Sequence, residues 1–534
     1  MKKFLYLLSI VTALFFVGCA GKYIHTTKGT VVVKEHKTAS PSLYYLAKDD
    51  ISSHYPKTGF YPLQNNLDAF AARVKLINSA KKTLDLQYFI FAEDETAYYI
   101  THSLLKAADR GVKVRVLLDD LLKKDSDVEL DALASHPNIE IKFFNPTTAR
   151  KLRGWLQMGF NINTLGRRMH NKLLVADNSA AIIGGRNIEN IYFAADKENI
   201  FIDNDVLAIG PLAAQATNEF ETYWRSKISI SIHEVATDEG KADFDHLKEK
   251  LEDYIHTIKY NEYNEEATKR PFAIAAKNNE IPLYYGNAKL YFDIPTKVTS
   301  SEDDTSTHLS RHLTPLIEKT KKSLKIINPY FIPNENMMNA IKELRQRGVE
   351  IYIVTNSLAT NDGIPVYSAY SKYQKRLIEL GVHLYELNPN SFKYIYKNQK
   401  YRKGSIPRSS LHAKNMLIDD EIFIIGSANL DPRSIKLNTE VVAVIDSKEL
   451  AKVEAEVFNH ITQPQNVFKL TIEDMPKAEC GDTCDLLPQN KKRVVWITEE
   501  NGKEVKYYND GNAGFWRRLG SNLSAYVPFL DKYL

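Results

Sequence analysis

Cysteine is scarce in this sequence, which has only three among 534 residues. A zinc ribbon or a thiolate cluster therefore cannot be built from cysteine alone. An excess of charge is also missing, because 70 lysines and arginines face 66 aspartates and glutamates, a net charge of +4. This balance argues against a general nucleic-acid coat protein, although it leaves room for local basic patches. With 44% apolar and 25% charged residues the composition is globular, which excludes disordered, collagen-like and disulfide-dense chains.

The apolar run near the N-terminus, from Phe4 to Val17, is shorter than the ~20 residues that a bilayer span requires. The small residues around Cys19 resemble a bacterial lipoprotein signal, which implies cleavage before Cys19 and a lipid on that cysteine. We therefore expect a signal peptide over 1–18, a polar tether over 19–60 and a membrane-anchored, periplasm-facing lipoprotein. Ala20 resembles the sorting pattern for the outer membrane. A plain secretory signal or an uncleaved anchor is the alternative.

Export would place the two remaining cysteines in an oxidising compartment. Cys480 and Cys484 are four positions apart, so they are able to close a small disulfide loop. A metal site fits less well, because no companion Cys/His pair lies at a useful spacing. We expect this loop to stiffen the chain locally and to have no catalytic role.

The chain repeats its pattern of strands and helices. The strand-like runs LDLQYFIF and KIINPYFIP each lead into a helical stretch, an Arg-Gly pair and a second strand, and a third strand then ends in Asn-Pro. Such alternation predicts an α/β fold with a parallel or mixed sheet and helices on its faces.

Two later segments, 169–187 and 411–431, match residue by residue at a constant offset of 242. The sequence therefore predicts two duplicated domains, 61–235 and 285–463, followed by an extension over 464–534. The matched residues are His170, Lys172, Asp177, Gly184 and Asn187 in the first copy and His412, Lys414, Asp419, Gly426 and Asn429 in the second, with Gly185 opposite Ser427.

A charged insert, 236–284, separates the two copies. We predict that it is a solvated helical bridge without a function of its own. Its apolar residues recur at helical spacing, at Phe244, Leu247, Leu251 and Ile255.

The spacing of histidine and lysine in each copy carries chemical information. On a strand, residues i and i+2 face the same way, so His170 and Lys172 project together, as do His412 and Lys414. A cation beside an imidazole favours the neutral, nucleophilic ring and supplies positive charge for an anionic substrate. Two such copies at equal spacing are far beyond coincidence.

The other matched residues suggest supporting roles. Asp177 and Asp419 fall where the strand meets a turn, so the geometry favours ordering of the turn over contact with substrate. Small residues on the returning strand, Gly185 and Ser427 among them, let the backbone approach a phosphate closely.

Each histidine also needs a carboxylate to fix its tautomer. Glu440 and Asp205 both open an apolar strand after the motifs. We predict that Asp205 orients His170 and that Glu440 orients His412. Asp203, on the same strand face as Asp205, is the alternative.

These motifs are those of the phospholipase D superfamily, which the sequence resembles in its two H-x-K-x4-D copies. Within that superfamily the chain is similar to bacterial cardiolipin synthases of the C type. The resemblance covers about residues 60–534 and rests on RGVKVRVLLDD, RRMHNKLLVADNSAAIIGGRNIENIYF, NPYFIPNE, HAKNMLIDD, GSANLDPRS and WITEENGKEVKYYNDGNAGFWRRLG. It implies two α-β-α sandwich domains related by a pseudo-two-fold axis.

The resemblance also implies a two-step phosphodiester exchange through a phosphohistidine, with neither a metal nor another cofactor. It makes His170 the nucleophile and His412 the acid and base, although the internal symmetry leaves the reverse assignment open. It includes Asp177 and Asp419 in the catalytic motifs. The non-bridging oxygens of the phosphate would be held by Lys172, Lys414, Asn187 and Asn429.

The implied reaction joins phosphatidylglycerol to a second phospholipid, either phosphatidylglycerol or phosphatidylethanolamine, to form cardiolipin. Hydrolysis of phospholipids to phosphatidic acid and an exported nuclease are the alternatives, although we expect no nucleic-acid partner. An anionic phospholipid and a membrane surface are the expected partners. The C-terminal segment either lies on that surface or packs on the body, because it has apolar residues at helical spacing beside two arginines. These are Phe515, Leu519, Leu523 and Tyr526, with Arg517 and Arg518.

Overall fold

The computed structural model describes most of the chain from residue 51 onward. The described residues are 51–120, 127–146, 166–196, 198–235, 243–256, 265–391, 395, 408–474 and 492–524. The expectations for Cys19, for Cys480 and Cys484 and for Tyr526 lie outside these residues.

A first lobe is built on a mixed sheet with the strand order β9-β4-β3-β2-β5-β6-β8-β1. Strands β2, β3 and β4 are parallel to one another, and the other neighbours are antiparallel. The strands are β1 (Thr58–Leu63), β2 (Thr83–Tyr88), β3 (Lys113–Asp119), β4 (Ile139–Phe144), β5 (Leu173–Ala176), β6 (Ala180–Gly184), β8 (Asp205–Ile209) and β9 (Ser229–Ser231).

A second lobe repeats this topology in the order β10-β17-β16-β15-β11-β12-β13-β18-β19-β20. Here β11, β12 and β13 are the parallel strands. The strands are β10 (Tyr284–Phe292), β11 (Ser323–Ile327), β12 (Glu350–Asn356), β13 (His383–Leu387), β15 (Asn415–Ile418), β16 (Ile422–Gly426), β17 (Val441–Asp446), β18 (Val467–Asp474), β19 (Lys492–Glu500) and β20 (Lys503–Tyr507).

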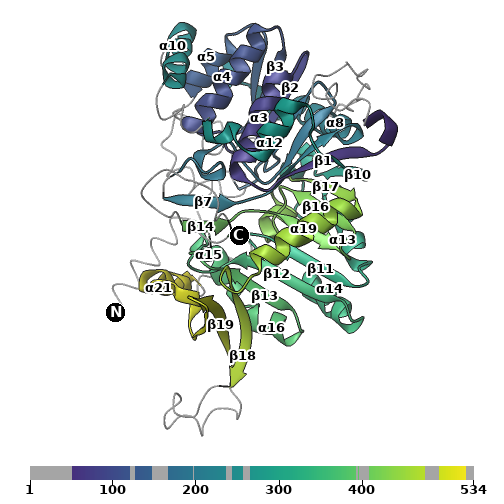
Figure 1. The fold of residues 1–534 in the computed structure, drawn as a ribbon, viewed down its shortest axis with the longest axis vertical. Coiled ribbons are helices and arrows are strands. Elements are labelled where there is room, and N and C mark those ends of the chain that lie inside the picture. Colours follow the sequence, from purple (N-terminus) through teal and green to yellow (C-terminus); the bar gives the residue numbers. More distant parts are fainter. Residues whose placement is uncertain are drawn as a thin grey trace.

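The two lobes meet at β1 and β10, which hold equivalent places in their sheets. These strands pair antiparallel, with Thr58 opposite Gly286 and Phe60 opposite Tyr284. Because equivalent antiparallel strands are related by a two-fold rotation, the whole sheet has a pseudo-two-fold axis at this junction (Figure 1). The predicted fold class, two duplicated α/β domains with mixed sheets, is confirmed.

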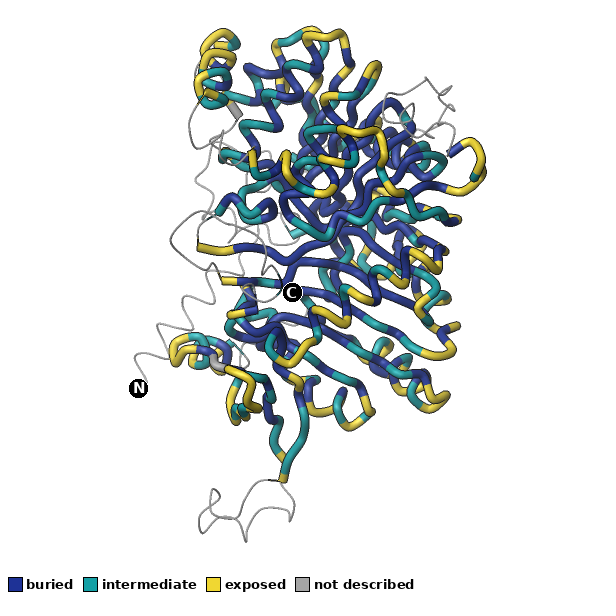
Figure 2. Tube along the Cα trace, viewed as in Figure 1, coloured by how far each residue is buried: buried dark blue, intermediate teal, exposed yellow. Residues whose placement is uncertain are grey.

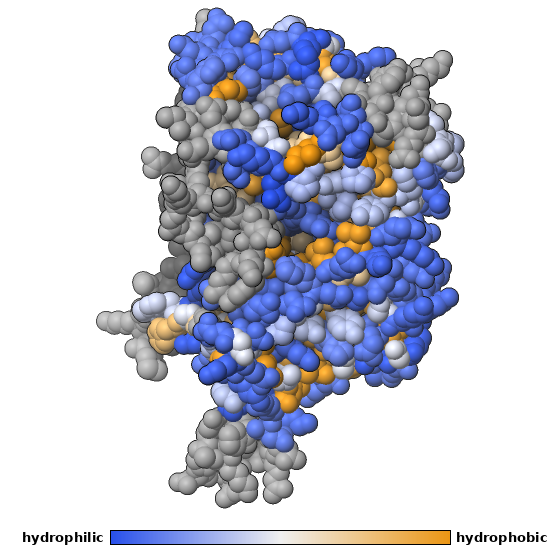
Figure 3. Space-filling view, viewed as in Figure 1, coloured by the Kyte–Doolittle hydropathy of each residue, from blue (hydrophilic) through white to orange (hydrophobic). Residues whose placement is uncertain are grey.

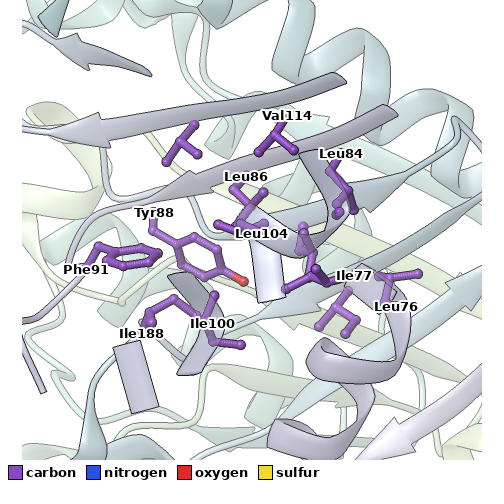
Figure 4. Packing of buried hydrophobic residues seen from close by; sticks show 14 of the residues in the cluster. Leu76, Ile77, Leu84, Leu86, Tyr88, Phe91, Ile100, Leu104, Val114 and Ile188 are labelled. Carbon is purple, nitrogen blue, oxygen red and sulfur yellow. The ribbon is translucent and has the colours of Figure 1, made fainter. Parts of the chain in front are cut away.

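The side-chain alternation of β2 shows how each sheet buries a face under helices. Leu84, Leu86 and Tyr88 point to one side, where α3 (Asn66–Ser79) and α4 (Glu95–Asp109) cover them (Figure 4). Each such buried side chain contributes about 1.5–3 kcal/mol. The central strands β5, β6, β15 and β16 are accordingly almost wholly buried, whereas the edge strand β20 is largely exposed (Figure 2).

A layer of two helices packs between the two lobes at the centre of the molecule. Helices α8 (Pro211–Trp224) and α19 (Lys448–Ile461) belong to different lobes, yet one apolar cluster contains Ala213 and Phe220 of α8 together with Leu450 of α19. The lobes therefore share a core, which fixes their relative orientation.

The charged insert differs from the solvated bridge expected for it. Its helices α10 (Phe244–Ile255) and α12 (Pro271–Asn278) bury Leu247, Leu251 and Phe272 in the core of the first lobe. The remaining α-helices are α5 (Asp127–Ala134), α9 (Ile232–Val235), α13 (Ser310–Glu318), α14 (Glu335–Gln346), α15 (Ile364–Ser371), α16 (Gln374–Glu379), α18 (Pro432–Lys436) and α21 (Phe515–Ser524).

A buried carboxyl links the lobes beside this shared core. Glu454 on α19 accepts hydrogen bonds from Gln64 Nε2 at 3.0 Å and from Asn204 Nδ2 at 2.8 Å, both in the first lobe. Burial raises its pKa to about 7, since its hydrogen-bond partners are neutral amides.

We expect Glu454→Gln to change how stability depends on pH. The pKa of this carboxyl rises from 4.5 in the unfolded chain to about 7 in the fold. The contribution of this carboxyl to the free energy of unfolding is therefore complete below pH 4.5. It is lost as the pH rises through 7, a loss of about 3 kcal/mol. Thermal unfolding from pH 5 to 8 should show wild type losing stability relative to the variant. The exposed Glu456→Gln on the same helix is the matched control, and a constant wild-type-to-variant difference would contradict the expectation.

Candidate active site

The two histidine–lysine pairs lie at the starts of equivalent central strands. His170 and Lys172 immediately precede β5, and His412 and Lys414 immediately precede β15, all four buried. In each pair the lysine Nζ donates to the main-chain oxygen of the histidine at 2.6 Å. Each ammonium is thereby held beside its own imidazole, as the two-residue spacing predicts.

The orienting carboxylates are crossed between the lobes. Glu440 of the second lobe lies 2.9 Å from Nδ1 of His170, and Asp203 of the first lobe lies 2.7 Å from Nδ1 of His412. A carboxylate only accepts hydrogen bonds, so each Nδ1 carries the proton and each Nε2 is left as the reactive nitrogen. The prediction that Asp205 orients His170 and that Glu440 orients His412 is therefore wrong, and Asp203, the alternative to Asp205, contacts His412 and not His170.

Main-chain pairing between the lobes produces this crossing. Strand β7 (Asn199–Ile202), which leads to Asp203, pairs parallel with β14 (Arg408–Leu411), which leads to His412. On the other side the amide of His170 donates to Thr439 O at 2.9 Å, one residue before Glu440. Each motif is thus attached to the segment that carries its carboxylate.

Asp205 has a structural role in place of the predicted one. Its carboxylate accepts from Nη1 of Arg186 and forms an ion pair with Arg73, each at 3.0 Å. All three side chains are buried, and the two guanidinium groups balance the charge of Asp205 far better than an imidazole would. A Cβ on Gly184 would lie 2.1 Å from Asp205, which explains the need for glycine there.

Burial and like charges hold both imidazoles in the neutral form. Burial first, then Lys172 and Lys414, lower the pKa of His170 to about 4, against the opposing effect of Glu440. The pKa of His412 is lowered to about 4 by burial and by the same two lysines. Because each ring responds to the lysine of the other motif, the pairs form one electrostatic site.

The pKa values of the lysines and carboxylates in this site are set by burial and by the attraction between opposite charges. Burial lowers the pKa of Lys414 to about 8, although Asp203 and Glu440 oppose the change. The pKa of Asp203 falls to about 2, because attraction to His412 and Lys414 exceeds the cost of its burial. Lys414 is therefore charged near neutral pH and available to an anionic substrate.

The motif aspartates lie away from the rings, at the far ends of β5 and β15. Asp177 accepts from the amides of Lys81, Lys82 and Thr83 at 2.7–3.0 Å. Asp419 makes the equivalent contacts at the start of β11. Their inclusion among the catalytic residues is corrected, because both carboxylates are occupied in joining a turn to the neighbouring strand.

The returning strands supply residues that differ between the lobes. A Cβ on Gly185 would lie 2.3 Å from Oδ1 of Asp203, so this position must remain glycine. Ser427, its counterpart, instead donates to Glu440 at 2.5 Å. The same carboxylate also accepts from the hydroxyl of Ser434.

The two asparagines are placed differently from one another. The Asn187 side chain accepts from the Ile90 amide at 3.1 Å and donates to Tyr192 Oη at 2.9 Å. Asn429 Oδ1 is buried without a hydrogen-bond partner in the described part of the chain. The phosphate-holding roles of Asn187 and Asn429 stay predictions.

Three aromatic side chains that sequence reasoning missed surround the rings. Phe201 stacks on His412 with centroids 4.9 Å apart, and Tyr192 Oη lies 3.4 Å from its Nε2. Phe89 meets His170 edge-on at 5.2 Å. Tyr192 lies 242 positions before Ser434, which is the offset between the two copies of the repeat. Comparison of the two copies could therefore have identified this position.

A cleft of about 870 Å³ opens between the lobes, and Asp203, which holds His412, is among the residues that line it. It is lined by Ala413 and Asn415, which alternate with His412 and Lys414 along the chain, and by α19. Apolar residues gather in this region between the lobes in Figure 3. Among the described residues, no group of three His, Cys, Asp or Glu side chains is arranged to hold a metal ion.

The geometry defines a class of enzyme. Two carboxylate-bound imidazoles with unprotonated Nε2 atoms and an accompanying ammonium charge are suited to covalent transfer of an anionic phosphodiester. The fold and the site are those of a duplicated transferase or hydrolase of phosphodiesters.

Comparison with known proteins gives the family. Residues 74–224 and 313–462 match the model of the family described as "Cardiolipin synthase, PLD-like domain". Cardiolipin synthase C of Escherichia coli (strain K12) is 33% identical over 481 residues, which cover 89% of this chain and 96% of that protein. The chain belongs to the cardiolipin synthase family of PLD-like domain proteins.

Other similarities agree with this membership. The major cardiolipin synthase of Bacillus subtilis (strain 168) is 26% identical over 396 residues, 73% of this chain and 66% of that protein. Phosphatidylserine synthase of Haemophilus influenzae Rd KW20 shares the fold, with a TM-score of 0.52 at 16% identity, and covers 79% of this chain and 91% of that one.

The crossed carboxylates predict opposite outcomes for neighbouring acidic residues. Glu440→Gln and Asp203→Asn should each lower kcat about 10²–10⁴-fold, because an amide no longer fixes the tautomer of its histidine. Asp205→Asn should instead lower the melting temperature, since two buried arginines lose their anion. Turnover and thermal unfolding of the three variants test this, and an Asp205→Asn enzyme that folds normally but is inactive would contradict it.

The pKa of Lys414 predicts how kcat/KM falls at alkaline pH. With a pKa of about 8 this lysine loses its charge as the pH rises through that value, so kcat/KM should fall above pH 8. Lys414→Arg keeps the charge at all accessible pH values and should move the limb to higher pH, whatever its effect on the maximal rate. The measurement is kcat/KM from pH 6 to 10, and an unmoved limb would show that another group is titrating.

Proposed function

We propose that this protein is a phosphatidyltransferase that forms cardiolipin from phosphatidylglycerol and a second phospholipid, phosphatidylglycerol or phosphatidylethanolamine. The observation that carries the proposal is the single site in which the two lobes hold two neutral imidazoles by crossed carboxylates. The family membership and the similarity to cardiolipin synthase C, which spans nearly the whole of that protein, support the choice of substrate.

In the first step, Nε2 of His170 attacks the phosphorus of the donor lipid, which is phosphatidylglycerol or phosphatidylethanolamine. The bond to the oxygen of the departing glycerol or ethanolamine breaks, and His412 gives that oxygen a proton. His412 must be protonated for this, and an anionic phosphodiester next to its ring favours the protonated form. Lys414 stabilises the negative charge on the non-bridging oxygens.

In the second step, the now neutral His412 removes the proton from a glycerol hydroxyl of the acceptor, a phosphatidylglycerol. That oxygen attacks the phosphorus, the P–N bond to His170 breaks, and both histidines return to their starting state. Each imidazole keeps its orientation because Glu440 and Asp203 hold Nδ1 throughout.

We further propose that a lipid on Cys19 anchors the protein in the outer membrane with its body in the periplasm, where this active site meets phospholipid. Among the described residues, none of the helices combines the length and the apolarity that crossing a bilayer requires. Cys19→Ser should leave the protein in the soluble periplasmic fraction and prevent incorporation of labelled fatty acid. Fractionation and labelling test this, and a variant that stays labelled would contradict it.

The reaction is tested with the full chain and labelled phosphatidylglycerol vesicles, alone and with phosphatidylethanolamine. Mass spectrometry should show new cardiolipin, with free glycerol when phosphatidylglycerol is the donor and free ethanolamine when phosphatidylethanolamine is the donor. Phosphatidic acid without cardiolipin would make the protein a hydrolase. Cleaved plasmid with intact lipid would make it a nuclease.

Rapid-quench trapping tests the division of labour between the histidines. His412→Ala should accumulate a phosphatidyl-enzyme, because it keeps the nucleophile but lacks the group that activates the acceptor. His170→Ala should form none. Label retained by His170→Ala would reverse the two roles.

A further inference from the structure

The C-terminal helix α21 has two faces of opposite character. One face holds the body: the Arg517 guanidinium donates to the main-chain oxygens of Leu358, at 2.8 Å, and of Asn361. On the same side the buried Ser521 accepts a hydrogen bond through its main-chain oxygen from Ser368 Oγ at 3.0 Å. These contacts fix which side of the helix faces outward.

The outward face is apolar and exposed. Phe515 is 62%, Trp516 78% and Leu523 63% exposed, and Leu519 is 38% exposed. Nine large apolar side chains are exposed in the described chain, and four of them lie in these ten residues. Figure 2 shows the alternation of exposed and buried positions along α21. Scattered apolar residues are ordinary on a surface, whereas such a concentration marks a site of contact.

The charge of α21 indicates what it contacts. Its sequence, FWRRLGSNLS, contains two arginines and no acidic residue. Burial and then the neighbouring Arg408 lower the pKa of the Arg517 guanidinium, against the opposing effect of Asp362. Aromatic and leucine side chains beside arginines are typical of helices that lie in the interfacial region of an anionic bilayer.

The position of α21 connects this face to the active site. The segment from Asn356 to Asn361 lies between the helix and strand β14, which leads to His412. The Asn356 side chain pairs with the main chain of Leu411 at 2.8 and 2.9 Å, and Ser410 Oγ donates to Thr360 O at 2.7 Å. Only the segment from Asn356 to Asn361 therefore separates α21, and any surface that it binds, from the residue before His412.

We propose that α21 docks on a phospholipid bilayer, with Phe515, Trp516, Leu519 and Leu523 in the lipid and Arg518 at the headgroups. The docked helix holds the active site against the surface that contains its substrate. This inference rests on the proposed function, because a diacyl phospholipid stays in the bilayer and its phosphorus must reach a buried imidazole. A protein partner on the same face is an outcome that the test distinguishes.

The test uses the fluorescence of Trp516 in the full chain reconstituted with vesicles of phosphatidylglycerol and phosphatidylethanolamine. In a Trp155→Phe background, which removes the tryptophan that lies outside the described residues, lipids brominated near the headgroup end of the acyl chain should quench Trp516, while Trp224 and Trp496 are buried in the protein. Trp516→Phe should abolish the quenching. Equal quenching of wild type and Trp516→Phe, or none in either, would overturn the proposal and leave a protein as the occupant of this face.

A second measurement separates docking from folding and from chemistry. Phe515→Ser/Leu519→Ser/Leu523→Ser should lower the transfer rate on vesicles about tenfold or more, since it removes the apolar anchor. It should have a much smaller effect on monomeric short-chain phosphatidylglycerol, which needs no bilayer. Ile274→Ser changes an equally accessible apolar residue, 50% exposed, on α12 of the other lobe and is the matched control. An equal loss on both substrates would contradict docking.

The two proposals fail in distinguishable ways. If wild type transfers no phosphatidyl group to either form of substrate, the proposed function fails, while lipid quenching of Trp516 still reports docking. If transfer proceeds normally and Trp516 is not quenched, the docking proposal fails and the proposed function stands.

Discussion

Each reactive histidine is held by a carboxylate from the other lobe, and the rest of the structure is arranged around this crossed contact. His170 depends on Glu440 and His412 depends on Asp203, so neither lobe alone contains a complete site. The antiparallel join of β1 to β10 and the core shared by α8 and α19 fix the two lobes relative to each other. That rigidity is needed because catalysis by positioned groups is sensitive to displacements of about 1 Å.

The electrostatics of the site follow from burying several ionisable groups together. Burial alone would neutralise them, but mutual attraction keeps Asp203 and Glu440 ionised, and Lys414 remains charged near neutral pH. The imidazoles are instead made neutral, because burial and the two lysines act in the same direction on them. The site therefore offers neutral nucleophilic nitrogen and positive charge at once, which suits an anionic phosphodiester.

The departures from internal symmetry matter as much as the symmetry. The carboxylate that holds His170 accepts from two serine hydroxyls, whereas Gly185 occupies the corresponding place beside Asp203. A tyrosine hydroxyl lies close to His412. The two rings thus have different surroundings, as two different chemical tasks require. The C-terminal helix breaks the symmetry on a larger scale, because it packs on the second lobe beside the strand that leads to His412.

The duplication, the α/β class and the position of each lysine beside its histidine could be predicted from the amino-acid sequence, because these depend on local periodicity and on repeats that can be counted. The sequence could not determine the orienting carboxylates. In the sheets, Gly184 lies opposite Asp205 and Gly426 lies opposite Val442, so the true counterpart of Glu440 is Asp203, two residues before Asp205. A shift of two residues keeps every side chain on the same face of a strand, so alternation along the chain could not show it. Only the hydrogen-bonded register of the sheets, and the pairing of main chain between the lobes, decided which carboxylate meets which ring.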